Sequence, residues 1–180
     1  MMDSTIDATF RTFAAERRYS PATIERWARL AATDASALLG LVEELRPSEN
    51  QLRDLWTWME EIAARDRRTL ADVLAAAPIM AARRAASGRN DRLRLLKGAL
   101  RRERFPQLSA AEDQLATLIR ALELPRHVRL ITPEYLEGDT LRIEITANSA
   151  ATLRAAAAAL LAAAATPACA QLFAVLAGAE

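Results

Sequence analysis

The residues best suited to chemistry in this sequence are nine basic side chains between positions 83 and 104: Arg83, Arg84, Arg89, Arg92, Arg94, Lys97, Arg101, Arg102 and Arg104. The same arginine-rich segment contains two acidic residues, so it carries a net charge of +7 in a chain whose overall charge is +1. A guanidinium donates two parallel hydrogen bonds to a phosphate. A nucleic-acid backbone is therefore the polyanion that this segment would bind.

Helical spacing organises these charges. From about Asp91 to Arg104, an apolar stripe of Leu93, Leu96 and Leu100 lies beside a basic stripe. We expect the leucines to dock on a core and the basic side to face solvent. The predicted contacts to nucleic acid, of weak sequence specificity, are Arg94, Lys97, Arg101, Arg102 and Arg104. The alternative is a solvated face paired with the acidic flanking regions.

Catalytic and metal-binding patterns are not found in the sequence. It has no glycine-rich phosphate loop and no G-x-S-x-G motif. The single histidine, His127, and the single cysteine, Cys169, are interpreted as structural residues. We interpret Glu134, Glu137 and Asp139 as solvated residues of a hairpin turn; the alternative is that they bind a cation weakly. We predict no enzymatic activity, no metal site and no cofactor.

The first 80 residues are predicted to form a compact helical bundle. Ser20-Pro21 starts one helix, and Ser48 with Gln51 forms a capping box for another. Residues 81–106 are expected to be a basic linker and helix, because Ala81 to Asn90 lack an apolar period.

Residues 107–180 are predicted to fold as an αββα module. A capping box at Ser109 opens a helix, two alternating segments around Val128–Ile131 and Leu141–Ile145 form a hairpin, and Ser149 caps a final helix. The predicted fold class is therefore mainly α with a small β-hairpin (α+β): an N-terminal helical bundle plus the C-terminal αββα module.

The stretch from Ala111 to Leu161 resembles the C-terminal dimerisation domain of ParB-type partition proteins. The resemblance is carried by Leu122-Glu123-Leu124, the first strand, a turn at Gly138, the second strand, Ser149 and Leu153. It implies a homodimer with Leu141, Ile143 and Ile145 at or near a sheet shared by the two copies, and the predicted interface also includes Leu153 and Leu160. That family's nucleotide-binding N-terminal domain and its lysine-rich surface are not recognisable here. Ser20 to Trp27 also resemble part of the core-binding domain of tyrosine recombinases, without catalytic residues.

The alanine-rich helix after Ala150 independently favours oligomerisation. Arg154 is its only charge, and a helix that is apolar nearly all round is buried on more than one side. A two-stranded hairpin is also marginal by itself. A second copy would cover the helix; the alternative is that the N-terminal bundle covers it within one chain.

These observations lead to one expected function and one alternative. The first is a nucleic-acid-associated binding protein that forms a homodimer through its C-terminal module. The alternative is a protein–protein adaptor that binds no nucleic acid. The N-terminal residues do not resemble a signal peptide, no long apolar window predicts a membrane span, and the lone cysteine fits a reducing compartment, so we expect a cytoplasmic protein.

Overall fold

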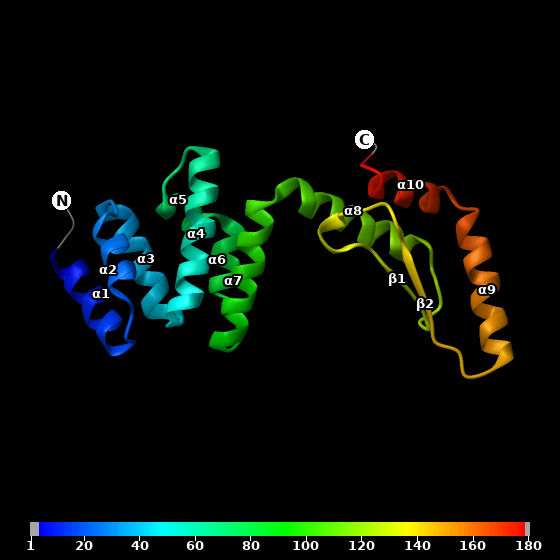
Figure 1. The fold of residues 1–180 in the computed structure, drawn as a ribbon, viewed down its shortest axis with the longest axis horizontal. Coiled ribbons are helices and arrows are strands. Elements are labelled where there is room, and N and C mark those ends of the chain that lie inside the picture. Colours follow the sequence, from blue (N-terminus) through cyan, green and yellow to red (C-terminus); the bar gives the residue numbers. More distant parts are fainter. Residues whose placement is uncertain (1–3, 179–180) are drawn as a thin grey trace. The chain divides into compact units, whose positions relative to one another are not determined.

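The computed structural model of the chain describes residues 4–178 and is mainly α-helical with one small antiparallel sheet (Figure 1). The predicted fold class is thus confirmed. The chain divides into two compact units, Met1–Phe105 and Pro106–Glu180. Each unit has its own cluster of buried apolar side chains.

The N-terminal unit is entirely helical over its described residues, apart from the short connections. Its elements are α1 (Ser4–Glu16), α2 (Pro21–Ala28), α3 (Ala32–Leu45), α4 (Glu49–Asp66), α5 (Leu70–Ala75), α6 (Ala77–Arg83) and α7 (Arg89–Arg104). Helix α4 packs against α5 and α7, and α3 packs against α1 and α5. Trp27 and Trp56 are among the largest fully buried side chains.

Both predicted helix starts in this unit are confirmed. Ser20 caps α2, and Ser48 with Gln51 forms the capping box of α4. Glu49 links the N-terminus of α4 to that of α2, because its carboxylate accepts hydrogen bonds from the Ser20 N–H (2.9 Å) and from the hydroxyls of Ser20 and Thr23. These bonds lower the pKa of Glu49 and so favour its charged form.

Residues 81–106 do not form a segment separate from the bundle. Helix α6 extends to Arg83, α7 begins at Arg89, and only the short stretch between them is non-helical. Leu93, Leu96 and Leu100 are buried in the N-terminal core, as the apolar stripe predicted. Because these three leucines anchor it, the basic helix belongs to the N-terminal unit.

The C-terminal unit has the predicted αββα order followed by one more helix. Its elements are α8 (Pro106–Ala121), β1 (Val128–Ile131), the 3-10 turn η1 (Glu134–Leu136), β2 (Arg142–Ile145), α9 (Ala150–Ala164) and α10 (Pro167–Leu176). Helix α10 packs on α8 and also contacts α9. Ser149 caps α9, as predicted.

The predicted capping box at Ser109 is wrong. Helix α8 begins three residues earlier at Pro106, a residue whose fixed φ suits the first helical position. Ser109 is therefore inside the helix and buried, and within residues 4–178 its hydroxyl has no hydrogen-bond partner.

Strands β1 and β2 form a two-stranded antiparallel sheet in which Leu130 lies opposite Ile143 and Arg129 lies opposite Glu144. All four residues of β2 are exposed. Helix α9, described in full, has only Ala156 and Ala163 buried. The burial predicted for this helix is therefore not achieved within its own unit.

Between residues 4 and 178, no single helix is long and apolar enough to cross a membrane. The helices α9 and α10 pass such a test only when taken together, and a bend of 78° separates them.

Candidate interaction surfaces

The basic side chains of α6 and α7 meet carboxylates of α3 and α4. The Glu44 carboxylate on α3 accepts hydrogen bonds from the guanidinium groups of Arg83 (2.8 Å) and Arg92 (3.1 Å). These ion pairs link α6 and α7 to α3. Farther along α7, Arg104 pairs with Glu61 on α4. Much of the positive charge that the sequence concentrates here is therefore balanced inside the same unit.

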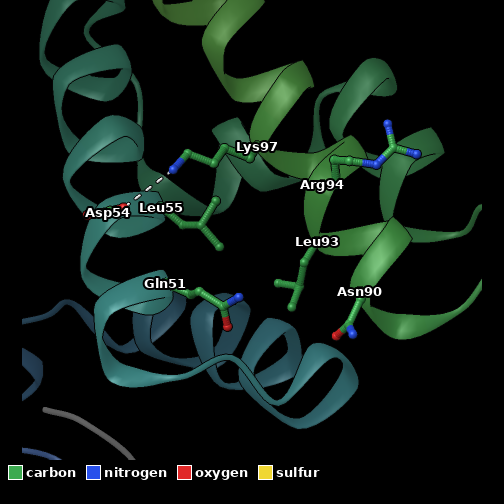
Figure 2. Close-up of a pocket in the computed structure, with 7 residues that line it drawn as sticks. All are labelled: Gln51, Asp54, Leu55, Asn90, Leu93, Arg94 and Lys97. Atoms are coloured by element: carbon green, nitrogen blue, oxygen red, sulfur yellow. Dashed lines mark hydrogen bonds and ion pairs between the residues drawn. The ribbon is translucent and has the colours of Figure 1, made fainter.

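The first half of α7 borders a shallow pocket of about 270 Å³ against α4 (Figure 2). Leu55 and Leu93 form its apolar part. Lys97 reaches across to Asp54, with Nζ 3.5 Å from the carboxylate, whereas Arg94 points away from this pair. The side chain of Arg94 is 74% exposed and is paired with Asp91 on its own helix at 3.3 Å. Arg94 is thus more open to solvent than Lys97.

Aromatic rings lie among these cations. Lys97 Nζ is 5.2 Å and the Arg104 guanidinium carbon 5.4 Å from the Trp58 ring centroid. The same guanidinium lies 4.6 Å from the Phe105 centroid, and Phe105 is exposed. Arg65 donates a 2.8 Å hydrogen bond to the carbonyl of Arg104 near the end of α7. We call the surface formed by Trp58, Arg94, Lys97, Arg104 and Phe105 the α7 face.

The five residues predicted to bind nucleic acid all lie on α7, but they differ in exposure. Arg94, Lys97 and Arg102 are exposed, whereas Arg101 and Arg104 are half-buried. Trp58 was not predicted, although its position two residues after the buried Trp56 places it about 200° around α4 from that side chain. No local pattern indicated that α4 would supply Asp54 and Glu61 as partners, because those contacts are non-local.

In the C-terminal unit, an apolar groove of about 520 Å³ opens between the hairpin, α9 and α10. Its lining is almost wholly hydrocarbon and includes Leu122, Leu124, Leu130, Leu141, Ile143, Leu160, Leu161, Leu172 and Phe173. Ile143 is 47%, Leu153 50% and Leu161 77% exposed. Ile143 and Leu161 both line the groove, so these two large side chains belong to one apolar surface rather than being scattered exposed residues.

Three of the five predicted interface residues, Leu141, Ile143 and Leu160, line this groove. Ile145 and Leu153 are exposed large hydrophobic residues of the same unit. Leu161 and Phe173 were not predicted. Leu161 directly follows Leu160 in an alanine-rich helix, so the large size of its side chain could have identified it from the sequence.

The remaining titratable candidates do not assemble into a site. The structure, over residues 4–178, has no group of three or more His, Cys, Asp or Glu side chains arranged to hold a metal ion. Cys169 is partly buried and lines the apolar groove. His127 is also half-buried, and its backbone carbonyl accepts a hydrogen bond from Thr146.

Comparison with protein families, with curated proteins and with solved structures finds no significant match to this chain. The arguments for its function therefore come from these two surfaces.

Proposed function

We propose that this chain is a homodimeric binding protein, in which the C-terminal unit associates with a second copy and so brings two N-terminal units into one molecule. The observation that carries the proposal is the apolar surface around Ile143, Leu160 and Leu161, which is left uncovered by its own unit. Apolar patches of this kind mark interaction sites in folded proteins.

The small core of the C-terminal unit supports self-association. Among the described residues, its cluster of buried apolar side chains has five members, Leu115, Leu122, Ala163, Leu172 and Leu176, against 24 in the N-terminal unit. Units of this size gain stability by adding buried area from another chain. A second copy supplies the same exposed strand and helix in return, since a twofold interface uses one patch on both partners. ParB-type dimerisation domains, which this region resembles, associate in this general way.

The expected mass in solution is twice the 19.7 kDa of one chain. It is best measured by sedimentation equilibrium or light scattering over a dilution series, because the monomer should appear only at the lowest concentrations. A mass of one chain at tens of micromolar would contradict the proposal.

A second candidate function is contact with a nucleic-acid backbone through the α7 face. The observation in its favour is the alternation of cations with the rings of Trp58 and Phe105, because arginines bind phosphate and aromatic rings stack on bases. Asp54, Glu61 and Asp91 oppose it, since a phosphate must compete with them for the same cations. Binding through this face is therefore expected to be weak.

We expect affinity for a labelled oligonucleotide, measured by fluorescence anisotropy, to fall steeply with added salt. Each lost phosphate contact should reduce the slope of log K against log salt by roughly one. Arg94→Ala should thus lower both affinity and slope. Arg11→Ala is the matched control, because Arg11 also pairs with an aspartate one turn earlier on its helix, Asp7.

Affinity that does not change between low and moderate salt would remove this candidate. If the chain instead retains protein partners from lysate after nuclease treatment and binds no oligonucleotide, the result favours the protein–protein adaptor that the sequence offered as the alternative.

A further inference from the structure

A groove between α6 and α7 opens on the N-terminal unit, where these two helices pack side by side (Figure 1). It encloses about 480 Å³, a volume within the range of ligand-binding pockets. The α6 side contributes Ala81, and the α7 side contributes Leu95 and Gly98. Arg94 and Arg102 of α7 also line it. The groove therefore combines an apolar floor with cationic side chains.

This groove is on a different side of α7 from the Trp58 ring. At 3.6 residues per turn, Lys97 and Arg104 project in nearly the same direction, toward α4. Leu95 and Arg102 project about 160° away from them, toward α6. A ligand in the groove would thus leave Lys97, Arg104 and the ring of Trp58 uncovered.

Leu95 and Gly98 make the floor of the groove both apolar and low. Leu95 is outside the buried leucine stripe of α7 and is 39% exposed. Gly98 is exposed in the middle of the helix, and a Cβ built on it would meet no described atom within 4 Å. Alanine would fit there and favours a helix more than glycine does, so the packing of the described unit does not require glycine. The effect of the glycine is to let another chain approach the α7 backbone closely.

The two arginines place positive charge on both sides of this floor along the helix. Arg94 and Arg102 are both exposed, and their separation in the sequence corresponds to about 12 Å along α7. Among the described residues that line the groove, no side chain is acidic. Asp91 pairs with Arg94 at 3.3 Å, but both side chains are exposed, and exposed ion pairs contribute little to stability. A carboxylate from a ligand can therefore replace that of Asp91.

We propose that this groove binds an amphipathic helix of a partner protein, with one large apolar side chain against Leu95 above Gly98. Acidic side chains two turns apart on that helix pair with Arg94 and Arg102. The inference goes beyond the proposed dimer, because it concerns the other unit and a chain of different sequence. It also gives the adaptor that the sequence offered as an alternative a defined binding site.

The surroundings favour a helix over an extended peptide. The described part of the N-terminal unit is helical and offers no sheet edge, so an extended peptide would leave its backbone groups unpaired. A helix satisfies its own backbone, and two of its turns span about 11 Å, close to the separation of Arg94 and Arg102. A protein also fits better than a nucleic acid, because the described lining has an exposed leucine and no aromatic ring on which a base could stack.

Peptide display on the full chain tests the proposal. A library of helical peptides of about 20 residues is selected against wild type, and fluorescence anisotropy measures the enriched peptides. We expect these peptides to share one large apolar residue between acidic residues two turns apart. Replacing either acidic residue by glutamine should weaken binding severalfold. Enrichment of no peptide, or of peptides without acidic residues, would overturn the proposal.

Gly98→Gln tests the floor, since it places a side chain in the groove without changing the charge. It should weaken the selected peptides at least about tenfold by blocking the site of the apolar anchor. Gly40→Gln is the matched control and should leave the affinity unchanged. Gly40 is inside α3 of the same unit, and its Cβ would likewise meet no described atom within 4 Å. Circular dichroism checks that both variants are folded.

Arg102→Glu tests the charge and should weaken the selected peptides roughly tenfold. A peptide with lysine in place of the matching acidic residue should bind Arg102→Glu better than it binds wild type. Equal peptide affinity for wild type, Gly98→Gln and Arg102→Glu would rule the groove out. Gly98→Gln weakening a labelled oligonucleotide as much as the peptides would also do so, because the groove would then belong to a nucleic-acid surface. These measurements do not depend on the mass in solution, so the proposed dimer stands or falls separately.

Discussion

Ile143→Asp is expected to convert the proposed dimer into a monomer. Ile143 lines the apolar groove and is 47% exposed, so it lies on the surface that we propose as the dimer interface. Each dimer would then bury two aspartates in its apolar interface, and a buried unpaired charge costs about 3–5 kcal/mol. We expect the dissociation constant to rise at least about a thousandfold, as measured by sedimentation over a dilution series.

Two control variants separate this effect from general damage. Ile143→Val retains an apolar β-branched residue and should leave the dimer nearly intact. Leu95→Asp changes another exposed large aliphatic side chain, on α7 of the N-terminal unit, and should leave the mass unchanged. Far-UV circular dichroism checks that each variant is folded. A folded Ile143→Asp protein that still has the mass of two chains would contradict the proposed interface.

Trp27→Ala is expected to destabilise the N-terminal unit by about 3–5 kcal/mol, the usual cost of deleting a large aromatic side chain from a core. Trp27 is fully buried and stacks on Phe10, with ring centroids 3.8 Å apart and planes within 5°. The cavity would lie where α1 meets α2. Urea unfolding followed by circular dichroism measures the loss as a shift of the midpoint.

Trp27→Phe should cost clearly less, because it keeps a ring against Phe10 and removes a buried indole N–H that has no hydrogen-bond partner among the described residues. Trp58→Ala is the matched surface control, since Trp58 is only half-buried. Both Trp27 variants should retain the mass of two chains under native conditions, because the proposed interface is in the other unit. Equal destabilisation by Trp27→Ala and Trp58→Ala would contradict this description of the core.

Local sequence signals predicted several of the helix starts, because a cap and its helix are neighbours in the chain. Ser20 before Pro21, and Ser48 with Gln51, cap their helices as expected. The start predicted at Ser109 is wrong because Pro106, three residues earlier, is also a helix-start signal, and the helix begins there. Two adequate starts in one segment cannot be ranked without knowing which side chains the helix must bury.

For the α7 face, the charge pattern shows how far prediction from the sequence reaches. The sequence determined that seven surplus positive charges fall between residues 83 and 104 and that three leucines would anchor their helix. It did not determine that Glu44, Asp54 and Glu61 would meet them. The carboxylates of Glu44 and Asp54 are 39 to 48 residues away in the chain from the cations they pair with, so only the packing of α3, α4 and α7 brings them into range.

For the C-terminal unit, the sequence determined the order of elements and the apolar character of α9, because both follow from periodicity and composition. Only the tertiary structure decided that Ile143 and Leu161 stay exposed. The physical reason is that periodicity fixes which side chains share a face, whereas burial depends on what packs against that face. Within this unit α8 and α10 pack together, whereas no element of the unit buries β2 or most of α9.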